Sequence, residues 1–157
     1  MISKVLIIAD TTKQSSISVL DAFRMIRNDQ QSVKAIFASY LSDLFKKSLG
    51  PNTLTHWARE EEDSLERVRN YFARMEIPYH FKIIAVPPLG MIFEEMGEGV
   101  YDLILLQSGL LKKWRKKGAN CALCSDALSK SRCPILVINS SEDKDEMGSA
   151  IQGEDAR

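Results

Sequence analysis

Short apolar runs alternate with longer amphipathic stretches along this chain. Five runs rich in β-branched and aliphatic residues predict strands: Lys4–Ala9, Ser32–Tyr40, Tyr79–Val86, Tyr101–Leu106 and Pro134–Ile138. The run at Tyr101–Leu106 is almost wholly apolar and ends at the polar break Gln107-Ser108-Gly109. We therefore expect it to be a central strand that is buried on both faces.

The segments between these runs carry apolar residues at helical spacing. A first helix, capped from the loop Thr11–Ser16, would turn one face inward: Ile17, Leu20, Phe23 (or Ala22) and Ile26. A long charged helix is expected from Thr53 or Thr55 to about Met75. Its core stripe would be Trp57, Leu65, Val68 and Phe72. Its Arg- and Glu-rich side is interpreted as a solvated face.

Three further segments are predicted to be short helices or turns. Leu41–Asn52 gives a short amphipathic turn, Leu89–Glu98 a short helix, and Asn120 or Ser125 starts a helix that ends near Ser131. The helix at Leu89–Glu98 would turn Ile92, Phe93 and Met96 inward.

Strands that alternate with helices predict βαβ units, and therefore an α/β fold with a mostly parallel sheet and helices on both faces. We expect one domain over residues 1–139. Residues 140–157 are polar and acidic and lack a periodic apolar face, which predicts a disordered tail.

Composition narrows the class of protein. The 157 residues carry a formal net charge of zero, so the whole molecule has no electrostatic bias toward nucleic acid or a membrane. The apolar run Val5–Ala9 is too short for a signal peptide or a membrane span. Three cysteines, an odd number, argue against a secreted disulfide framework. We therefore expect a cytoplasmic protein.

Ligands of open α/β sheets bind outside the carboxyl ends of the strands. Asp10 follows the first strand, and Gln107, Ser108 and Gly109 follow the fourth. Asp10 would either contact the base or hydroxyl of a ligand, or cap the following loop and helix through Thr12 or Lys13. The sequence alone does not separate these two roles.

A basic run follows the fourth strand: Lys112, Lys113, Arg115, Lys116 and Lys117, with Trp114 inside it. It would be a solvated loop, an electrostatic clamp for a phosphate, or, least favoured, a nucleic-acid patch with Trp114 as a stacking platform. Cys121 and Cys124 form a Cys-x-x-Cys at the start of the last predicted helix. They are interpreted as core residues, with a redox pair as the alternative.

Catalytic and metal constellations are not visible in the sequence. The two histidines, His56 and His80, stand beside no plausible nucleophile, so hydrolytic catalysis is not expected. No metal site is expected either, because a Cys-x-x-Cys alone supplies too few ligands.

The chain resembles the universal stress protein family over roughly residues 1–139. The resemblance rests on Lys4–Asp10, on Asp102–Leu106 and, most specifically, on Ser131–Ile138 with its Cys133-Pro134 entry into the last strand. It implies an open, doubly wound five-stranded sheet of order 3-2-1-4-5. It also implies a homodimer paired through Pro134–Ile138, and an exposed apolar edge strand invites such pairing.

ATP-binding members of that family carry a Gly-x2-Gly-x9-Gly-(Ser/Thr) loop after the fourth strand, where glycines and a helix start cradle the phosphates. Here Gly109 is present, but the second glycine position falls near Leu111 or Lys112 and the last pair at about Cys121-Ala122. Gly118 is followed by Ala119. The motif is therefore lost or rebuilt. Asp10 matches the family acid that contacts adenine in binders.

The sequence supports two functional hypotheses. The first is a universal-stress-protein-like signalling module that acts through dimerisation and an unidentified protein partner, without a cofactor or enzymatic activity. The second is an adenine-nucleotide binder, for ATP or AMP, with at most weak ATPase activity. The candidate binding residues are Asp10, Thr11, Thr12, Ala38, Gln107, Ser108, Gly109, Lys112, Lys113 and Gly118.

Overall fold

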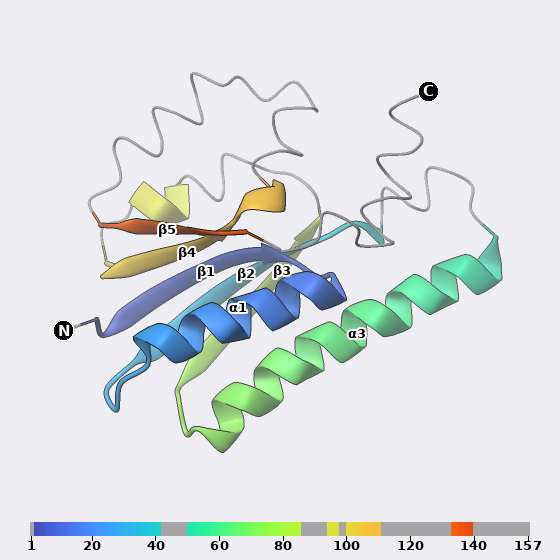
Figure 1. Ribbon diagram of the computed structural model, residues 1–157. Coiled ribbons are helices and arrows are strands. Elements are labelled where there is room, and N and C mark those ends of the chain that lie inside the picture. Colours follow the sequence, from blue (N-terminus) through green and yellow to red (C-terminus); the bar gives the residue numbers. More distant parts are fainter. Residues whose placement is uncertain (1, 42–49, 86–93, 98–99, 111–132, 140–157) are drawn as a thin grey trace.

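A computed structural model describes residues 2–41, 50–85, 94–97, 100–110 and 133–139. Within these ranges the chain forms a five-stranded parallel sheet with two long helices (Figure 1). The elements are, in order, β1 (Lys4–Asp10), α1 (Lys13–Ile26), β2 (Ser32–Ser39), α3 (Pro51–Arg74), β3 (Tyr79–Ala85), β4 (Leu103–Gln107) and β5 (Ile135–Ile138).

The strand order is β3-β2-β1-β4-β5, and every pairing is parallel. This confirms the expected doubly wound sheet of order 3-2-1-4-5. The first strand therefore lies in the middle, between β2 and β4. All five residues of β4 are buried, as the apolar run at Tyr101–Leu106 predicts. Because all strands run the same way, their carboxyl ends meet at one edge of the sheet.

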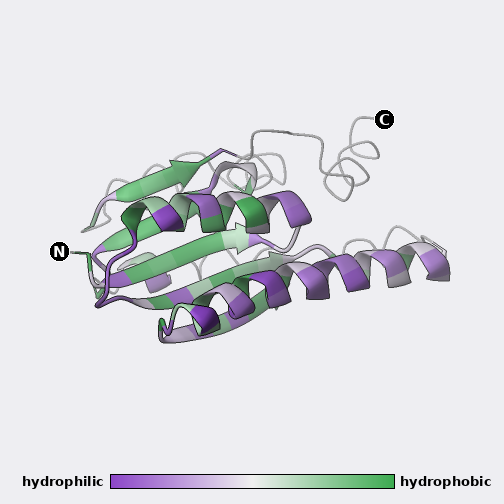
Figure 2. Cartoon of the chain, turned by 60° about the horizontal axis from the view of Figure 1, so that its bottom comes forward, coloured by the Kyte–Doolittle hydropathy of each residue, from purple (hydrophilic) through white to green (hydrophobic). Residues whose placement is uncertain are grey.

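The two faces of the sheet bury separate apolar clusters. Both α1 and α3 cover one face (Figure 1), where Ile7 of β1 packs with Phe23 and Phe72. On the other face Ile8 packs with Met96, from helical residues 94–97, and with Leu110. The sheet thus has helical cover on both faces, as predicted. Among the described elements, the central strands are strongly hydrophobic (Figure 2).

Helix positions agree with the sequence pattern, with two adjustments. In α1, Leu20 and Phe23 are buried as expected, but Val19 is buried while Ile17 and Ile26 are only half-buried. The buried face of α1 is therefore rotated slightly about the helix axis from the face that the sequence predicts. The long helix α3 begins at Pro51 rather than Thr53 or Thr55, because Gly50 is the N-cap and proline suits the first turn.

The stripe of Trp57, Leu65, Val68 and Phe72 on α3 is buried, as predicted. The predicted helix near Leu89–Glu98 is described only at residues 94–97, where Met96 is buried. Most of the predicted turn at Leu41–Asn52, the helix that ends near Ser131 and the tail at 140–157 lie outside the described residues.

Candidate functional site

The carboxyl ends of β1, β2 and β4 bring together most of the predicted site residues. Asp10 lies directly beside Ala38 in the parallel register, and Ile8 lies beside Leu106 one step before β4 ends. Asp10, Thr11, Thr12 and Gln107 are all buried. Lys112, Lys113 and Gly118, together with Cys121 and Cys124, lie outside the described residues.

Asp10 is enclosed by side chains of its own protein. Its Oδ1 accepts hydrogen bonds from the backbone N–H of Thr12 (3.1 Å) and from the Thr12 hydroxyl (2.6 Å). Its Oδ2 accepts a hydrogen bond from the Tyr40 hydroxyl at 3.1 Å, and Tyr40 is 2% exposed. Of the two roles left open by the sequence, the structure therefore supports capping of the loop through Thr12.

Thr12, which is bonded to Asp10, in turn caps the helix α1. It is the N-cap residue, and its Oγ1 accepts a hydrogen bond from the backbone N–H of Ser15 at 3.2 Å. Such a cap satisfies one of the backbone donors that the first turn of a helix leaves unpaired. Asp10, Thr12 and the start of α1 thus form one continuous hydrogen-bonded unit.

Glu61 of α3 is a site residue that the sequence interpretation missed. The Arg- and Glu-rich side of the helix is predicted to be solvated, but Glu61 is 8% exposed. Its Oε2 accepts hydrogen bonds from the hydroxyls of Thr11 (2.8 Å) and Ser39 (2.6 Å). Assigning Glu61 to the solvated side is therefore wrong. The sequence signal that could have identified Glu61 as buried is its position one helical turn from both Trp57 and Leu65, inside the apolar stripe.

Ala38 contributes through its backbone rather than its side chain. Its carbonyl oxygen accepts a hydrogen bond from the backbone N–H of Thr11 at 3.2 Å, while its side chain is buried in the apolar cluster of the second face. This bond extends the contact between β1 and β2 beyond the last paired residues. It holds Thr11 where its hydroxyl reaches Glu61.

The end of β4 passes directly into helical backbone at residues 108–110. Gln107 is 3% exposed, and its side-chain amide lies against Gly109. A Cβ at Gly109 would stand only 2.7 Å from Nε2 of Gln107. Glycine is therefore the residue that lets this amide lie against the backbone. Ser108, between them, is half-buried.

The chemistry of this edge is that of a closed polar network. Asp10 and Glu61 bring two carboxyl groups to the ends of β1 and β2, and the hydroxyls of Thr11, Thr12, Ser39 and Tyr40 are bonded to them. His56 lies on α3 with its Nε2 3.6 Å from Glu60, and His80 belongs to β3. Neither histidine is hydrogen-bonded to this network in the part of the chain that the structure describes.

Within the described ranges, no group of three or more His, Cys, Asp or Glu side chains is arranged to hold a metal ion. None of the described helices is long and apolar enough to cross a membrane.

No family model matches the chain, and neither does any curated protein. Solved structures do match it. The hypothetical protein MJ0577 has a TM-score of 0.54 at 16% identity, with 88% of this chain and 96% of that chain covered. A universal stress protein in complex with cAMP gives 0.51 at 14% identity, covering 89% and 98%.

A universal stress protein family protein from Arabidopsis thaliana with AMP bound has a TM-score of 0.50 at 16% identity, with 90% of this chain and 94% of that chain covered. At these identities the likeness concerns the fold. The chain therefore has the fold of universal stress protein structures, as its sequence resemblance predicts.

Proposed function

We propose that this protein is a universal-stress-protein-like module for stress response or signalling, which acts through dimerisation and protein contacts rather than through strong ATP binding. The observation that carries this proposal is the Asp10 carboxylate. It is 5% exposed, and each of its oxygens already accepts a hydrogen bond, Oδ1 from Thr12 and Oδ2 from Tyr40. An adenine base that used Asp10 would have to reach this buried carboxylate and compete with the protein's own hydrogen bonds, and breaking a buried hydrogen bond is costly.

Electrostatics at the same edge supports the proposal. Glu61 adds a second carboxyl group beside Thr11. Negative charge at this position disfavours the phosphates of a nucleotide through like-charge repulsion. The glycine pattern that would cradle phosphates is also incomplete, because Leu111 and Lys112 stand where a glycine is needed.

The second candidate is an adenine-nucleotide binder. It is favoured by one observation: two solved structures of the same fold contain cAMP or AMP. In this protein the phosphates would rely on Ser108, Gly109 and the charges of Lys112 and Lys113 in place of the glycine cradle.

A thermal melt separates the two candidates. We expect no change in Tm on adding millimolar Mg-ATP, AMP or cAMP, and no nucleotide in the mass spectrum of the purified protein. A ligand at a hundred times its Kd would instead add about 2.7 kcal/mol to the free energy of unfolding. For a domain of this size that is a rise in Tm of several degrees.

The variant Tyr40→Phe is a second test, because it removes the hydrogen bond that Oδ2 of Asp10 accepts from Tyr40 and keeps the buried ring. The double variant Lys112→Gln, Lys113→Gln is its counterpart. A nucleotide-dependent rise in the Tm of the unmodified protein that disappears in the double variant would overturn the first candidate in favour of the second.

A further inference from the structure

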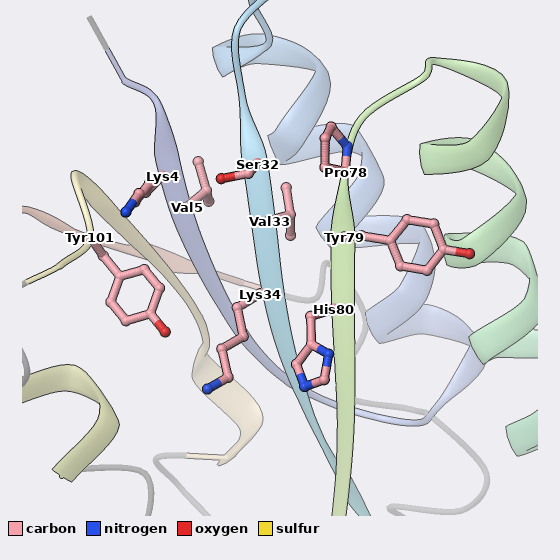
Figure 3. Close-up of a pocket in the computed structure, with 9 residues that line it drawn as sticks. All are labelled: Lys4, Val5, Ser32, Val33, Lys34, Pro78, Tyr79, His80 and Tyr101. Atoms are coloured by element: carbon pink, nitrogen blue, oxygen red, sulfur yellow. The ribbon is translucent and has the colours of Figure 1, made fainter.

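A hollow of about 300 Å³ lies at the other end of the sheet, at the amino ends of β1, β2 and β3. Lys4, Lys34, His80 and Tyr101 line it, together with backbone and apolar groups of the strands and Pro78 (Figure 3). Because the strands are parallel, this hollow is separated from Asp10 and Glu61 by the length of the sheet. It is not used by the function proposed above.

The strand register explains why basic groups gather there. Lys34 of β2 is paired directly with His80 of β3, and Lys4 of β1 is paired with Ser32, two residues before Lys34. Alternate residues of a strand project from the same face, so Lys4, Lys34 and His80 share one side of the sheet. Figure 3 shows Lys34, His80 and Tyr101 on that side, whereas Tyr79 projects toward the helices of the opposite face.

One acidic side chain, Glu95, holds this group in place. It forms an ion pair with Lys34 and accepts a hydrogen bond from the Tyr101 hydroxyl at 2.7 Å. Burial acts to raise the pKa of Glu95, but the hydrogen bonds from Lys34 and Tyr101 and the charges of Lys34 and Lys82 outweigh it and hold that pKa below its ordinary value. Glu95 is therefore ionised, and its negative charge balances the positive charge of Lys34.

Apart from its tyrosines, the ionisable side chains that line the hollow are basic. Lys4 adds a second ammonium group to the lining and His80 adds ring nitrogens, while the charge of Lys82 acts on Glu95. The nearby Asp102 carboxylate accepts hydrogen bonds at Oδ2 from the N–H groups of Ser3 and Lys4, and the charge of Lys4 also contributes to its lowered pKa. Among the described residues, the side chains that line the hollow thus include two lysine ammonium groups and no carboxylate, and Glu95 and Asp102 interact with these lysines from outside the lining.

We propose that this hollow binds a compact small molecule that carries a phosphate, with Lys4 and His80 contacting the phosphate and Lys34 positioned beside it by Glu95. Lysine ammonium groups are common phosphate ligands, and a dianion gains from two or more cations. The volume of about 300 Å³ is at the lower limit of small-molecule sites and therefore suits a compact ligand.

The test is an NMR titration of the full chain with inorganic phosphate, at constant ionic strength. We expect saturable shifts of the His80 ring resonances and of the backbone amides of Lys34 and Tyr101. Sodium acetate at equal ionic strength should give much smaller shifts. The double variant Lys4→Gln, His80→Gln removes two exposed side chains, so it should fold normally, and it should weaken phosphate binding about tenfold.

A matched control is Lys13→Gln, which removes an exposed lysine at the start of α1, near the carboxyl-end site. It should leave the titration unchanged. Shifts that are the same in the double variant as in the unmodified protein, or that respond to Lys13→Gln instead, would overturn the proposal. The nucleotide melt is assigned to the opposite end of the sheet by the double variant Lys112→Gln, Lys113→Gln, so the phosphate titration and the proposed function can fail independently.

Discussion

At the scale of single residues, the most informative side chain is Glu61. A carboxylate placed among Trp57, Leu65 and the core of α3 would be costly without partners. The hydroxyls of Thr11 and Ser39 supply them, at 2.8 and 2.6 Å. Glu61 therefore fastens the middle of α3 to the ends of β1 and β2.

Replacing Glu61 with alanine removes both of these hydrogen bonds and leaves the Thr11 hydroxyl buried without its acceptor. We expect Glu61→Ala to lower the free energy of unfolding by about 2 kcal/mol, measured by urea denaturation. The neighbouring Glu62→Ala is the matched control, since the Glu62 side chain is 65% exposed. Its effect should stay within about 0.5 kcal/mol. Equal losses in both variants would contradict the role assigned to Glu61.

These residues also mark how far the sequence could predict the site. Asp10 and Thr12 are two positions apart, so a local capping bond between them was among the sequence predictions. Tyr40 and Glu61 reach the site from 30 and 50 positions away, and no local pattern signals such contacts. The hydrogen bonds that enclose Asp10, and the support that they give to its capping role, could therefore be seen only in the fold.

At the scale of elements, Asp102 ties the beginning of β4 to the beginning of β1. Its carboxylate accepts hydrogen bonds from the backbone N–H groups of Ser3 and Lys4, both at 2.9 Å. Its own backbone N–H donates to the carbonyl oxygen of Lys4 at 2.8 Å. The hydrogen bonds from the backbone of Lys4 and Ser3 hold the pKa of Asp102 below its ordinary value of 3.8.

A carboxyl group whose pKa is lower in the folded state than in the unfolded state binds its proton later as the pH falls. Its contribution to stability is therefore present above pH 3.8 and is lost as the pH falls through the folded-state pKa. We expect Asp102→Asn to flatten the acid side of the stability curve, measured by urea unfolding from about pH 7 down to about pH 3. Asp29→Asn, in an exposed turn, is the matched control. An Asp102→Asn curve parallel to that of the unmodified protein would contradict this linkage.

The elements themselves were largely predictable because their signals are local. Each strand has a dense apolar run, and each described helix has a buried stripe at helical spacing. The differences arise from tertiary packing and capping. Val19 rather than Ile17 faces the sheet, and Gly50 with Pro51 starts α3 earlier than the threonines that suggested its beginning.

At the scale of the whole molecule, β5 is an edge strand of the sheet, and two of its apolar side chains are exposed to solvent. Leu136 and Val137 are each 44% exposed and, as successive strand residues, project from opposite faces. In the described ranges β5 pairs with β4 alone. An open apolar edge of this kind favours pairing with a second copy of the chain, which is the dimer proposed above.

Light scattering coupled to size exclusion at micromolar concentration tests that dimer. We expect the unmodified protein to be a dimer and Val137→Glu to be a monomer, because a charge on the edge strand opposes pairing. Ile83→Glu, on the opposite edge strand β3, is the matched control, since Ile83 is similarly exposed at 46%. A dimer that survives Val137→Glu but is lost in Ile83→Glu would move the interface to β3.

The central position of β1 also has a consequence for how the chain folds during synthesis. One edge of β1 can pair with β2 early, but its other edge pairs with β4, and the bonds from Ser3 to Asp102 join residues 99 positions apart. Closing so long a loop carries an entropic cost and slows folding. Until β4 leaves the ribosome, the apolar free edge of β1 is available to other chains. The growing chain is therefore most prone to aggregate in that interval.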